Sequence, residues 1–316
     1  MPKLVWIVAL FLAGSLHAAE EADLRLRIAK DEALHYDWGI SSNYETKGKD
    51  GDKDVDLKTE KYLGTVATLK GLESARPGET PIDLTCEGLY IQEERKDADV
   101  HSKLKIEGNH ILYTENDRTI VDSKNDVGLD KVNEYQKTLR ALEKGVAHLT
   151  LGPSGKPVQG GNAKLLETIQ GGRLNGIFPL LSGQVTALGT PWDERYEMTT
   201  LGDLELEKPA GVRTRMTFAK WEERGGVKLA LIEFVAAWDS DKLAGQDKER
   251  GLKVQIEQLK GLGSGVCYFD PKTGRFTEGS LSFILKYKIE GLRREDQSKV
   301  SLDVDGKTAV SFKLKP

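Results

Sequence analysis

Residues 213–238 read RTRMTFAKWEERGGVKLALIEFVAAW, and this stretch decides the fold. On both sides of Arg224-Gly225-Gly226, apolar and polar residues alternate with a period of two, which is typical of strands that bury one face. The paired glycines supply the positive φ angles that a tight chain reversal requires. The stretch therefore predicts an antiparallel hairpin with its tip at the glycines.

The same alternation continues toward the C-terminus. One predicted strand carries apolar residues at Leu281, Phe283, Leu285, Tyr287 and Ile289, with Ser280, Ser282, Lys286 and Lys288 on its other side. A last strand alternates in the same way, with Val310, Phe312 and Leu314 on its apolar side. Between the two, Asp305-Gly306 predicts another turn. Most of the chain therefore predicts strands with one buried face.

Helical patterns are scarce by comparison. Residues 126–144 predict one long helix, because Leu129, Val132, Leu139 and Leu142 form a single apolar stripe and Gly145 is a suitable C-terminal stop. A shorter helix is predicted over residues 162–169, where Asn162 is a favourable N-cap and two glycines follow the end.

These patterns predict an α+β fold made mostly of antiparallel β structure. We expect curved sheets or an incomplete barrel in two β-rich halves, with the one long and the one short helix between them. The expected divisions are a signal peptide over 1–19, an N-terminal β-rich half with central helices over 20–175, and a C-terminal antiparallel β half over 176–316.

The first 19 residues have the order of a secretory signal peptide: an early Lys3, an apolar run over residues 4–13, and small residues up to Ala18 and Ala19. The run is too short to cross a bilayer, which takes about 20 apolar residues. We expect cleavage after Ala18 or Ala19, a periplasmic or secreted protein, and no transmembrane segment.

Charge composition argues against nucleic-acid binding, and the cysteine content leaves a disulfide open. The chain has 46 basic and 50 acidic residues, interspersed along its length, so no basic patch predicts nucleic-acid binding. Its two cysteines are Cys86 and Cys267. An exported address makes a disulfide between them chemically allowed, and two separate buried thiols are the alternative.

Two short segments resemble motifs that accept or bind phosphate. Residues 270–274, DPKTG, resemble an aspartyl-phosphate acceptor, but Pro271 separates the aspartate from the lysine, and the pattern favours a hairpin turn closed by Gly274. Residues 152–156, GPSGK, resemble the end of a phosphate-binding loop. They lack its first glycine and its Ser or Thr after the lysine, so a second turn is predicted.

No residue set adds up to a reaction mechanism. The histidines after the signal peptide, His35, His101, His110 and His148, form no H-x-x-x-H pair, and the chain holds no G-x-S-x-G motif. We therefore predict no catalytic residues, no metal site and no cofactor, which makes the protein a non-enzyme; a hydrolase is the third-ranked hypothesis.

The tryptophans after the signal peptide are the candidate ligand-binding residues. Trp38, Trp192, Trp221 and Trp238 are large apolar groups that can line a cavity in a curved sheet. The alternative is that they simply fill the core.

Four segments in this order resemble an uncharacterised family of exported, β-rich bacterial envelope proteins, a domain of unknown function. They are residues 24–27 with 31–36 (LRLR and DEALHY), 149–156 (LTLGPSGK), 189–192 (GTPW) and 268–276 (YFDPKTGRF). The family has no assigned catalytic residues to carry over. More remotely, a long antiparallel sheet wrapped on a helix is similar to the half-barrels of periplasmic lipoprotein carriers, a similarity of architecture only.

The function expected from the sequence is that of a non-enzymatic envelope protein. It would bind an apolar ligand such as a lipid, or another envelope component, in the concave face of a sheet. The alternative is a structural or assembly factor that engages a protein partner through sheet edges. A deep apolar cavity favours the first function, and a packed core with exposed strand edges favours the second.

Overall fold

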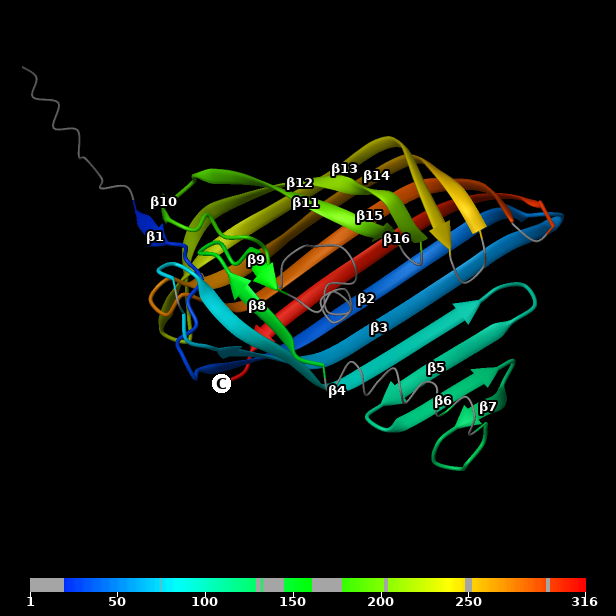
Figure 1. Cartoon of the computed structure of the whole chain (residues 1–316), viewed down its shortest axis with the longest axis horizontal. Coiled ribbons are helices and arrows are strands. Elements are labelled where there is room, and N and C mark those ends of the chain that lie inside the picture. The colour runs from blue at the N-terminus through cyan, green and yellow to red at the C-terminus, as the bar shows by residue number, and fades with distance from the viewer. Residues whose placement is uncertain are drawn as a thin grey trace, which may run out of the picture.

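A computed structural model describes residues 20–74, 76–128, 132, 145–160, 178–201, 204–247, 252–293 and 296–316 (Figure 1). Every regular element bounded within this part of the chain is a β-strand. The strands are β1 (Glu21–Asp23), β2 (Ala33–Asp50), β3 (Lys53–Gly71), β4 (Thr80–Lys96), β5 (His101–Glu107), β6 (His110–Glu115), β7 (Arg118–Asp122), β8 (Ala147–Leu151), β9 (Pro157–Gly160), β10 (Val185–Ala187), β11 (Pro191–Leu201), β12 (Leu204–Arg224), β13 (Val227–Asp247), β14 (Leu252–Asp270), β15 (Arg275–Arg293) and β16 (Lys299–Leu314).

The predicted α+β class is therefore wrong: the described part of the chain is all-β. The expected long helix begins at residues 126–128, which form a turn and an isolated bridge between Val127 and Asp122. Apart from Val132, the remainder of that helix and the whole of the expected short helix lie outside the described residues. The period-two pattern dominates because most of the described chain lies in long strands, which reach 21 residues in β12 and β13.

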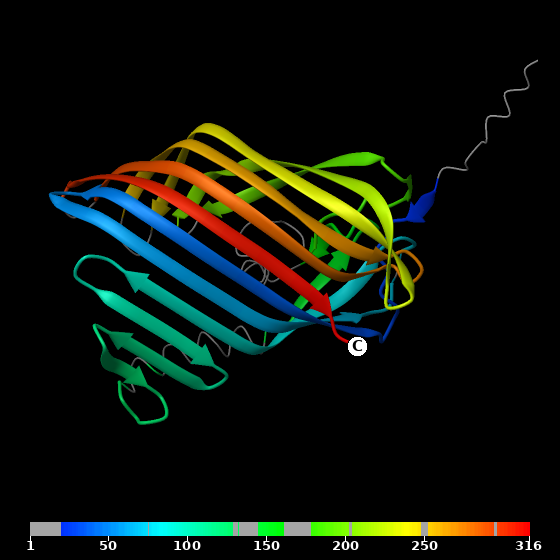
Figure 2. The ribbon, with the colours of Figure 1, turned by 180° about the vertical axis from the view of Figure 1, so that it is seen from behind.

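Fourteen strands form one antiparallel sheet, in the order β11-β12-β13-β14-β15-β16-β2-β3-β4-β5-β6-β7, with β8 attached to β4 and β9 attached to β8. The pairing of β16 with β2 joins the two ends of the sequence, for example Phe312 opposite Trp38. Strands from both predicted halves thus share one curved sheet (Figure 2). Strands β1 and β10 form a separate two-stranded sheet.

Alternation along each long strand gives the sheet two chemically different faces. In β15, Leu281, Phe283 and Leu285 are almost fully buried, whereas the intervening Ile284 is 47% exposed. We call the side that carries the buried positions the inner face and the opposite side the outer face. A sheet with one apolar and one hydrated face is the usual outcome for antiparallel strands, as the sequence predicts.

Three of the predicted turns are confirmed and one is wrong. Strands β12 and β13 reverse at Gly225 and Gly226, both with positive φ, and the DPKTG and GPSGK segments are the turns of the β14–β15 and β8–β9 hairpins. Asp305-Gly306, however, lies inside β16. Gly306 is opposite Tyr44 in β2, and a Cβ at Gly306 would stand 2.5 Å from the Tyr44 ring, so glycine here makes room for an aromatic side chain and no turn forms.

The same device recurs along the inner face. Strand β14 has glycine at positions 261, 263 and 265, and large side chains from neighbouring strands lie over these gaps. A Cβ at Gly261 would stand 2.9 Å from the Trp238 ring, and one at Gly263 would stand 2.6 Å from the Phe283 ring. Aromatic side chains that cover glycine backbone shield its hydrogen bonds and let the sheet bend.

A bulge in β4 marks the place where the sheet divides. Thr65 of β3 faces two residues of β4, Gly88 and Leu89, and its hydroxyl donates a hydrogen bond of 2.9 Å to the Glu87 carbonyl. Before the bulge, β4 pairs with β8; after it, β4 pairs with β5. The extra residue bends the strand, so the two ends of β4 separate toward different partners.

The segment between β1 and β2 crosses one end of the sheet and ties its loops together. Its backbone hydrogen bonds run from Leu24 to Gln184, from Leu26 to Pro153, from Arg27 to Gly274 and from Asp31 to Gly71, with lengths of 2.8–3.0 Å. Alternate side chains of this segment are buried in the core. We call this end of the sheet the closed end.

Candidate functional site: the inner face of the sheet

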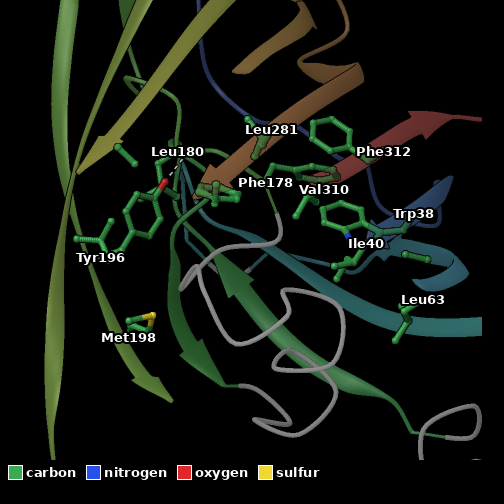
Figure 3. Close-up of a cluster of buried hydrophobic side chains, with 14 of the residues drawn as sticks. Trp38, Ile40, Leu63, Phe178, Leu180, Tyr196, Met198, Leu281, Val310 and Phe312 are labelled. Atoms are coloured by element: carbon green, nitrogen blue, oxygen red, sulfur yellow. Dashed lines mark hydrogen bonds between the residues drawn. The ribbon is translucent and has the colours of Figure 1, made fainter. Parts of the chain in front are cut away.

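An aromatic cluster occupies the inner face near the closed end (Figure 3). Phe178 lies at its centre, with its ring centroid 4.9 Å from Tyr36, 5.6 Å from Trp38, and 5.0 Å from both Phe276 and Phe312. Tilted and edge-to-face arrangements of this kind are the favourable ones for aromatic pairs. The cluster joins β2, β15 and β16 into one packed core.

The residues after Phe178 carry this core across to β11. The backbone N–H of Leu180 donates to the Tyr196 hydroxyl at 3.0 Å, and the Trp192 Nε1–H donates to the Leu180 carbonyl at 3.0 Å. Figure 3 shows Tyr196 and Met198 on one side, and Trp38, Ile40 and Leu63 on the other, with Phe178 and Leu180 between them. The curved sheet is therefore bridged near its closed end.

The structure separates the four candidate tryptophans into different environments. Trp38 stacks on Phe312 at 5.3 Å within the aromatic cluster, and Trp192 is held by Leu180. Trp221 packs edge-on against Phe218 at 5.0 Å, under the ammonium group of Lys228. Trp38 and Trp192 are thus brought together around the bridge, and Trp238 and Trp221 lie apart from it.

Trp238 and Trp221 each have a buried indole Nε1 without a hydrogen-bond partner in the described part of the chain, and Trp238 is the more deeply buried of the two. Its side chain is 2% exposed and packs edge-on against Phe283, with the ring centroids 5.6 Å apart. Its indole Nε1 is buried and has no hydrogen-bond partner within the described part of the chain. A buried donor without an acceptor costs about 1–3 kcal/mol, so this N–H is positioned for an acceptor that the described residues do not supply.

Neighbours of Trp238 on the inner face offer little polarity. Its cross-strand partners are Val212 and Gly261, and Leu285 follows next to Gly261. Thr214 and Thr308 are the buried hydroxyl groups of the adjacent row, which also holds Phe283. A molecule bound here would meet aliphatic and aromatic surface, one indole donor and a few hydroxyls.

The side chains that the sequence offers as possible catalytic or metal-binding groups pair with neighbouring residues. The Asp270 carboxylate accepts the Lys272 backbone N–H at 2.9 Å and the Thr273 hydroxyl at 2.7 Å, so it organises its own turn. His101 and His110 pair with carboxylates of Glu94 and Asp122. Within the described ranges, no group of three or more His, Cys, Asp or Glu residues could hold a metal ion.

Both cysteines are free and buried, on different strands of the sheet. Cys86 belongs to β4 and Cys267 to β14, which corresponds to the alternative of two separate buried thiols. Burial raises the pKa of the Cys86 thiol to about 11 and also raises that of Cys267.

We expect the free energy of unfolding to fall at alkaline pH. Thiols in the unfolded chain release protons near pH 9.0, whereas folded Cys86 holds its proton until about pH 11. Stability is therefore complete below pH 9.0 and is lost as the pH rises toward 11, and the raised pKa of buried Tyr36 and Tyr196 acts in the same direction. Thermal melts across this range should show the decline, and Cys86→Ala should make it shallower. A native protein whose thiols react at once with a chromogenic disulfide reagent would contradict the burial on which this rests.

Sequence reasoning missed the residues that bridge the sheet. Phe178, Leu180 and Tyr196 carry no motif and were not singled out. The available signal was the compact apolar run over residues 176–181, IFPLL after one glycine, which does not alternate as the strands do. Such a run is typical of a buried connecting segment as well as of a short strand.

Comparison with known proteins gives only remote likenesses. No protein-family model matches the chain, and no curated protein matches it. A solved structure of lipovitellin with its lipid–protein interactions has a TM-score of 0.45 and 9% identity, covering 92% of this chain and 26% of that chain. The outer membrane protein OprG from Pseudomonas aeruginosa gives a TM-score of 0.20, 8% identity, and coverage of 92% and 98%. OccK7 from Pseudomonas aeruginosa gives a TM-score of 0.21 and 8% identity, covering 90% of this chain and 99% of that chain.

These likenesses extend to β-rich architecture and carry no functional argument. The chain spans about a quarter of the lipovitellin chain that it matches. The resemblance to an exported envelope family stays a prediction from the sequence. Over the described residues, we find no helix with the length and apolarity needed to cross a membrane.

Proposed function

We propose that this protein binds an apolar ligand against the inner face of its sheet. The observation that carries the proposal is the continuity of that face. Across nine neighbouring strands, from β11 to β4, the buried positions are overwhelmingly aliphatic or aromatic. At about 4.8 Å per strand, this band is roughly 38 Å wide along the curve of the sheet.

Among the described contacts onto this band, those of Phe178 lie near the closed end. Phe178 contacts Phe276 there, whereas Leu285, which neighbours Gly261 beside Trp238, lies nine residues farther along β15. That separation is roughly 30 Å at about 3.3 Å per residue. We assign the ligand to the part of the inner face around Trp238, because the buried indole N–H there has no hydrogen-bond partner in the described part of the chain.

The unpartnered indole defines the class of ligand more narrowly. A pure hydrocarbon would leave the Trp238 Nε1–H unsatisfied, whereas an acyl ester or a fatty acid carries an oxygen that can accept it. One such hydrogen bond contributes about 0.5–1.5 kcal/mol, which is roughly threefold to tenfold in affinity. The preferred ligand in this proposal is an acyl chain that ends in a carbonyl or carboxyl group.

We expect a fluorescent fatty acid to bind at a saturable site and to quench tryptophan emission. Trp238→Phe keeps most of the aromatic surface but removes the donor, so it should weaken fatty-acid binding roughly threefold to tenfold. Binding of diphenylhexatriene, which has no acceptor, should be unchanged by the same substitution. Fluorescence titration of both probes measures the difference.

Trp192→Phe is the matched control, because the Trp192 Nε1–H is already bound to the Leu180 carbonyl. It should change stability without changing the ratio of the two probe affinities. If Trp238→Phe weakens the affinity for both probes equally, the proposed hydrogen bond between the indole and a ligand oxygen is wrong. Failure of both probes to saturate in the unaltered protein would remove the apolar-ligand function itself.

The second candidate function is assembly through a strand edge. In the described sheet, β11 is an outermost strand of 11 residues, and long edge strands can accept another strand. Charged side chains at Asp193, Arg195 and Glu197 along this edge oppose unspecific pairing. Assembly becomes the preferred function if neither apolar probe binds at a saturable site.

We also propose, from the signal-peptide pattern of residues 1–19, that binding takes place in the periplasm or outside the cell. A natural protein whose mass still includes Met1 would contradict this location.

A further inference from the structure

Exposed apolar side chains gather at one place on the outer face, in addition to the buried outer-face cluster of Leu229, Leu231 and Tyr268. Ala237, Leu262 and Ile284 are direct cross-strand neighbours on β13, β14 and β15, and Val235 lies one outer-face position away on β13. Leu262 is 70% exposed, Val235 51% and Ile284 47%. These strands lie side by side in Figure 2. We call these four residues the outer patch.

Cations stand at both ends of this row of cross-strand neighbours. Arg213 is opposite Ala237, Arg195 is opposite Arg213, and Lys307 is opposite Ile284. All three side chains are exposed, and within the described residues none has an ion pair or a side-chain hydrogen bond. By contrast, nearby Arg215 is neutralised by Asp193, with an N–O distance of 2.7 Å.

This arrangement is unfavourable for the protein alone. Like charges directly opposite on neighbouring strands repel, and exposed aliphatic groups gain nothing from water. The outer patch, Arg195 and Arg213 line an open groove with a volume of about 1030 Å³, whose lining also includes Asp193 and Glu194. An occupant that offers both anionic groups and apolar surface would relieve both costs.

We propose that the outer patch and its flanking cations dock this protein on an anionic lipid surface. The row from Arg195 to Lys307 crosses six strands, which is roughly 24 Å at about 4.8 Å per strand. Aliphatic side chains in the middle would enter the headgroup boundary, and the three cations would face lipid phosphates, each contributing about 1 kcal/mol near such a surface.

The composition favours a lipid surface over a protein partner. Contacts that dominate protein interfaces are enriched in Trp and Tyr, whereas this patch contains only Ala, Val, Leu and Ile. It also lies on the face of central strands whose backbone groups are paired on both sides, so a partner cannot add a strand there. The proposal stands on the outer face and does not require a ligand on the inner face.

Cosedimentation with vesicles tests the proposal. The full-length mature protein should bind vesicles of phosphatidylglycerol and phosphatidylcholine in equal parts more tightly than vesicles of phosphatidylcholine alone, and added salt should weaken the binding. Arg195→Gln with Arg213→Gln should reduce affinity roughly 25-fold, at about fivefold for each cation. Ile284→Glu should reduce it at least about tenfold, because a carboxylate would meet the apolar boundary.

Matched controls separate the patch from general effects of charge. Leu292 also lies on β15, is 51% exposed, and is eight residues from Ile284, so Leu292→Glu makes the same chemical change outside the patch. Lys47→Gln with Lys49→Gln removes two exposed cations elsewhere on the sheet. Both controls should retain vesicle binding within about twofold.

Three results would overturn the proposal. One is equal binding to the two kinds of vesicle. Another is equal weakening by Ile284→Glu and Leu292→Glu. The third is a concentration-dependent dimer that Ile284→Glu abolishes, since this would assign the outer patch to a second copy of the chain. Apolar-probe binding is measured in the same variants, so a failure here is distinguishable from failure of the inner-face function.

Discussion

Replacing Gly274 by valine is expected to destabilise the protein by about 3 kcal/mol or more. Gly274 closes the β14–β15 turn with a φ of 75°, where a β-branched residue is strained. A Cβ at this position would also stand 2.7 Å from the Arg27 Cβ and 3.0 Å from the Arg25 carbonyl oxygen. The substitution would thus push the crossing segment away from the turn and endanger the hydrogen bond from the Arg27 N–H to the Gly274 carbonyl. Thermal or denaturant unfolding measures the loss.

Asp270→Asn in the same turn is the matched control and should cost no more than about 1 kcal/mol. The asparagine carbonyl can still accept the Lys272 N–H, and its amide can donate to the Thr273 hydroxyl. If Gly274→Val is stable while Asp270→Asn loses a measurable activity, the turn explanation is wrong and the nucleophile reading of DPKTG returns.

Phe178→Ala is expected to cost about 3–5 kcal/mol. The Phe178 ring contacts four other rings, and its removal leaves a cavity that residues on β2, β15 and β16 cannot all close. The segment that Leu180 anchors to Tyr196 would lose its fixed position as well. Urea unfolding followed by tryptophan fluorescence reports the change, because Trp38 lies in the same cluster.

Phe178→Leu should recover more than half of that loss, since it refills most of the volume. Leu262→Ala, at a side chain that is 70% exposed, should stay within about 0.5 kcal/mol of the unaltered protein. A Phe178→Ala variant as stable as Leu262→Ala would show that the aromatic cluster does not hold the sheet together.

Much of the strand structure could be predicted from local patterns. The buried and exposed positions of Leu281–Ile289 follow the alternation of the sequence, and the double glycine at 225–226 forms the tip of the β12–β13 hairpin. Local rules failed at Gly306. Glycine after aspartate is a strong turn signal, but the space above Gly306 is filled by Tyr44 of another strand. That contact joins residues more than 250 positions apart and leaves no trace in a short window of sequence.

The candidate site was predictable only as a list of residue types. The four tryptophans were chosen for size, and the structure gives them different roles: Trp38 and Trp192 belong to the bridged core, and Trp238 and Trp221 keep unpartnered donors. Satisfaction of an indole N–H depends on which acceptor comes within about 3 Å, and this is a property of tertiary packing. The outer patch was missed for the same reason, because Val235, Leu262 and Ile284 are adjacent only through strand pairing.

By itself, the sequence determined that this protein is built from long amphipathic antiparallel strands, because a period of two places every second side chain on the same face whatever the partner strand is. Only the tertiary structure decided the order of those strands, the pairing of β16 with β2 that makes one sheet of both ends of the chain, and the bridge from Phe178 to Tyr196. These depend on register and on contacts between distant residues, and alternation alone is compatible with many such pairings.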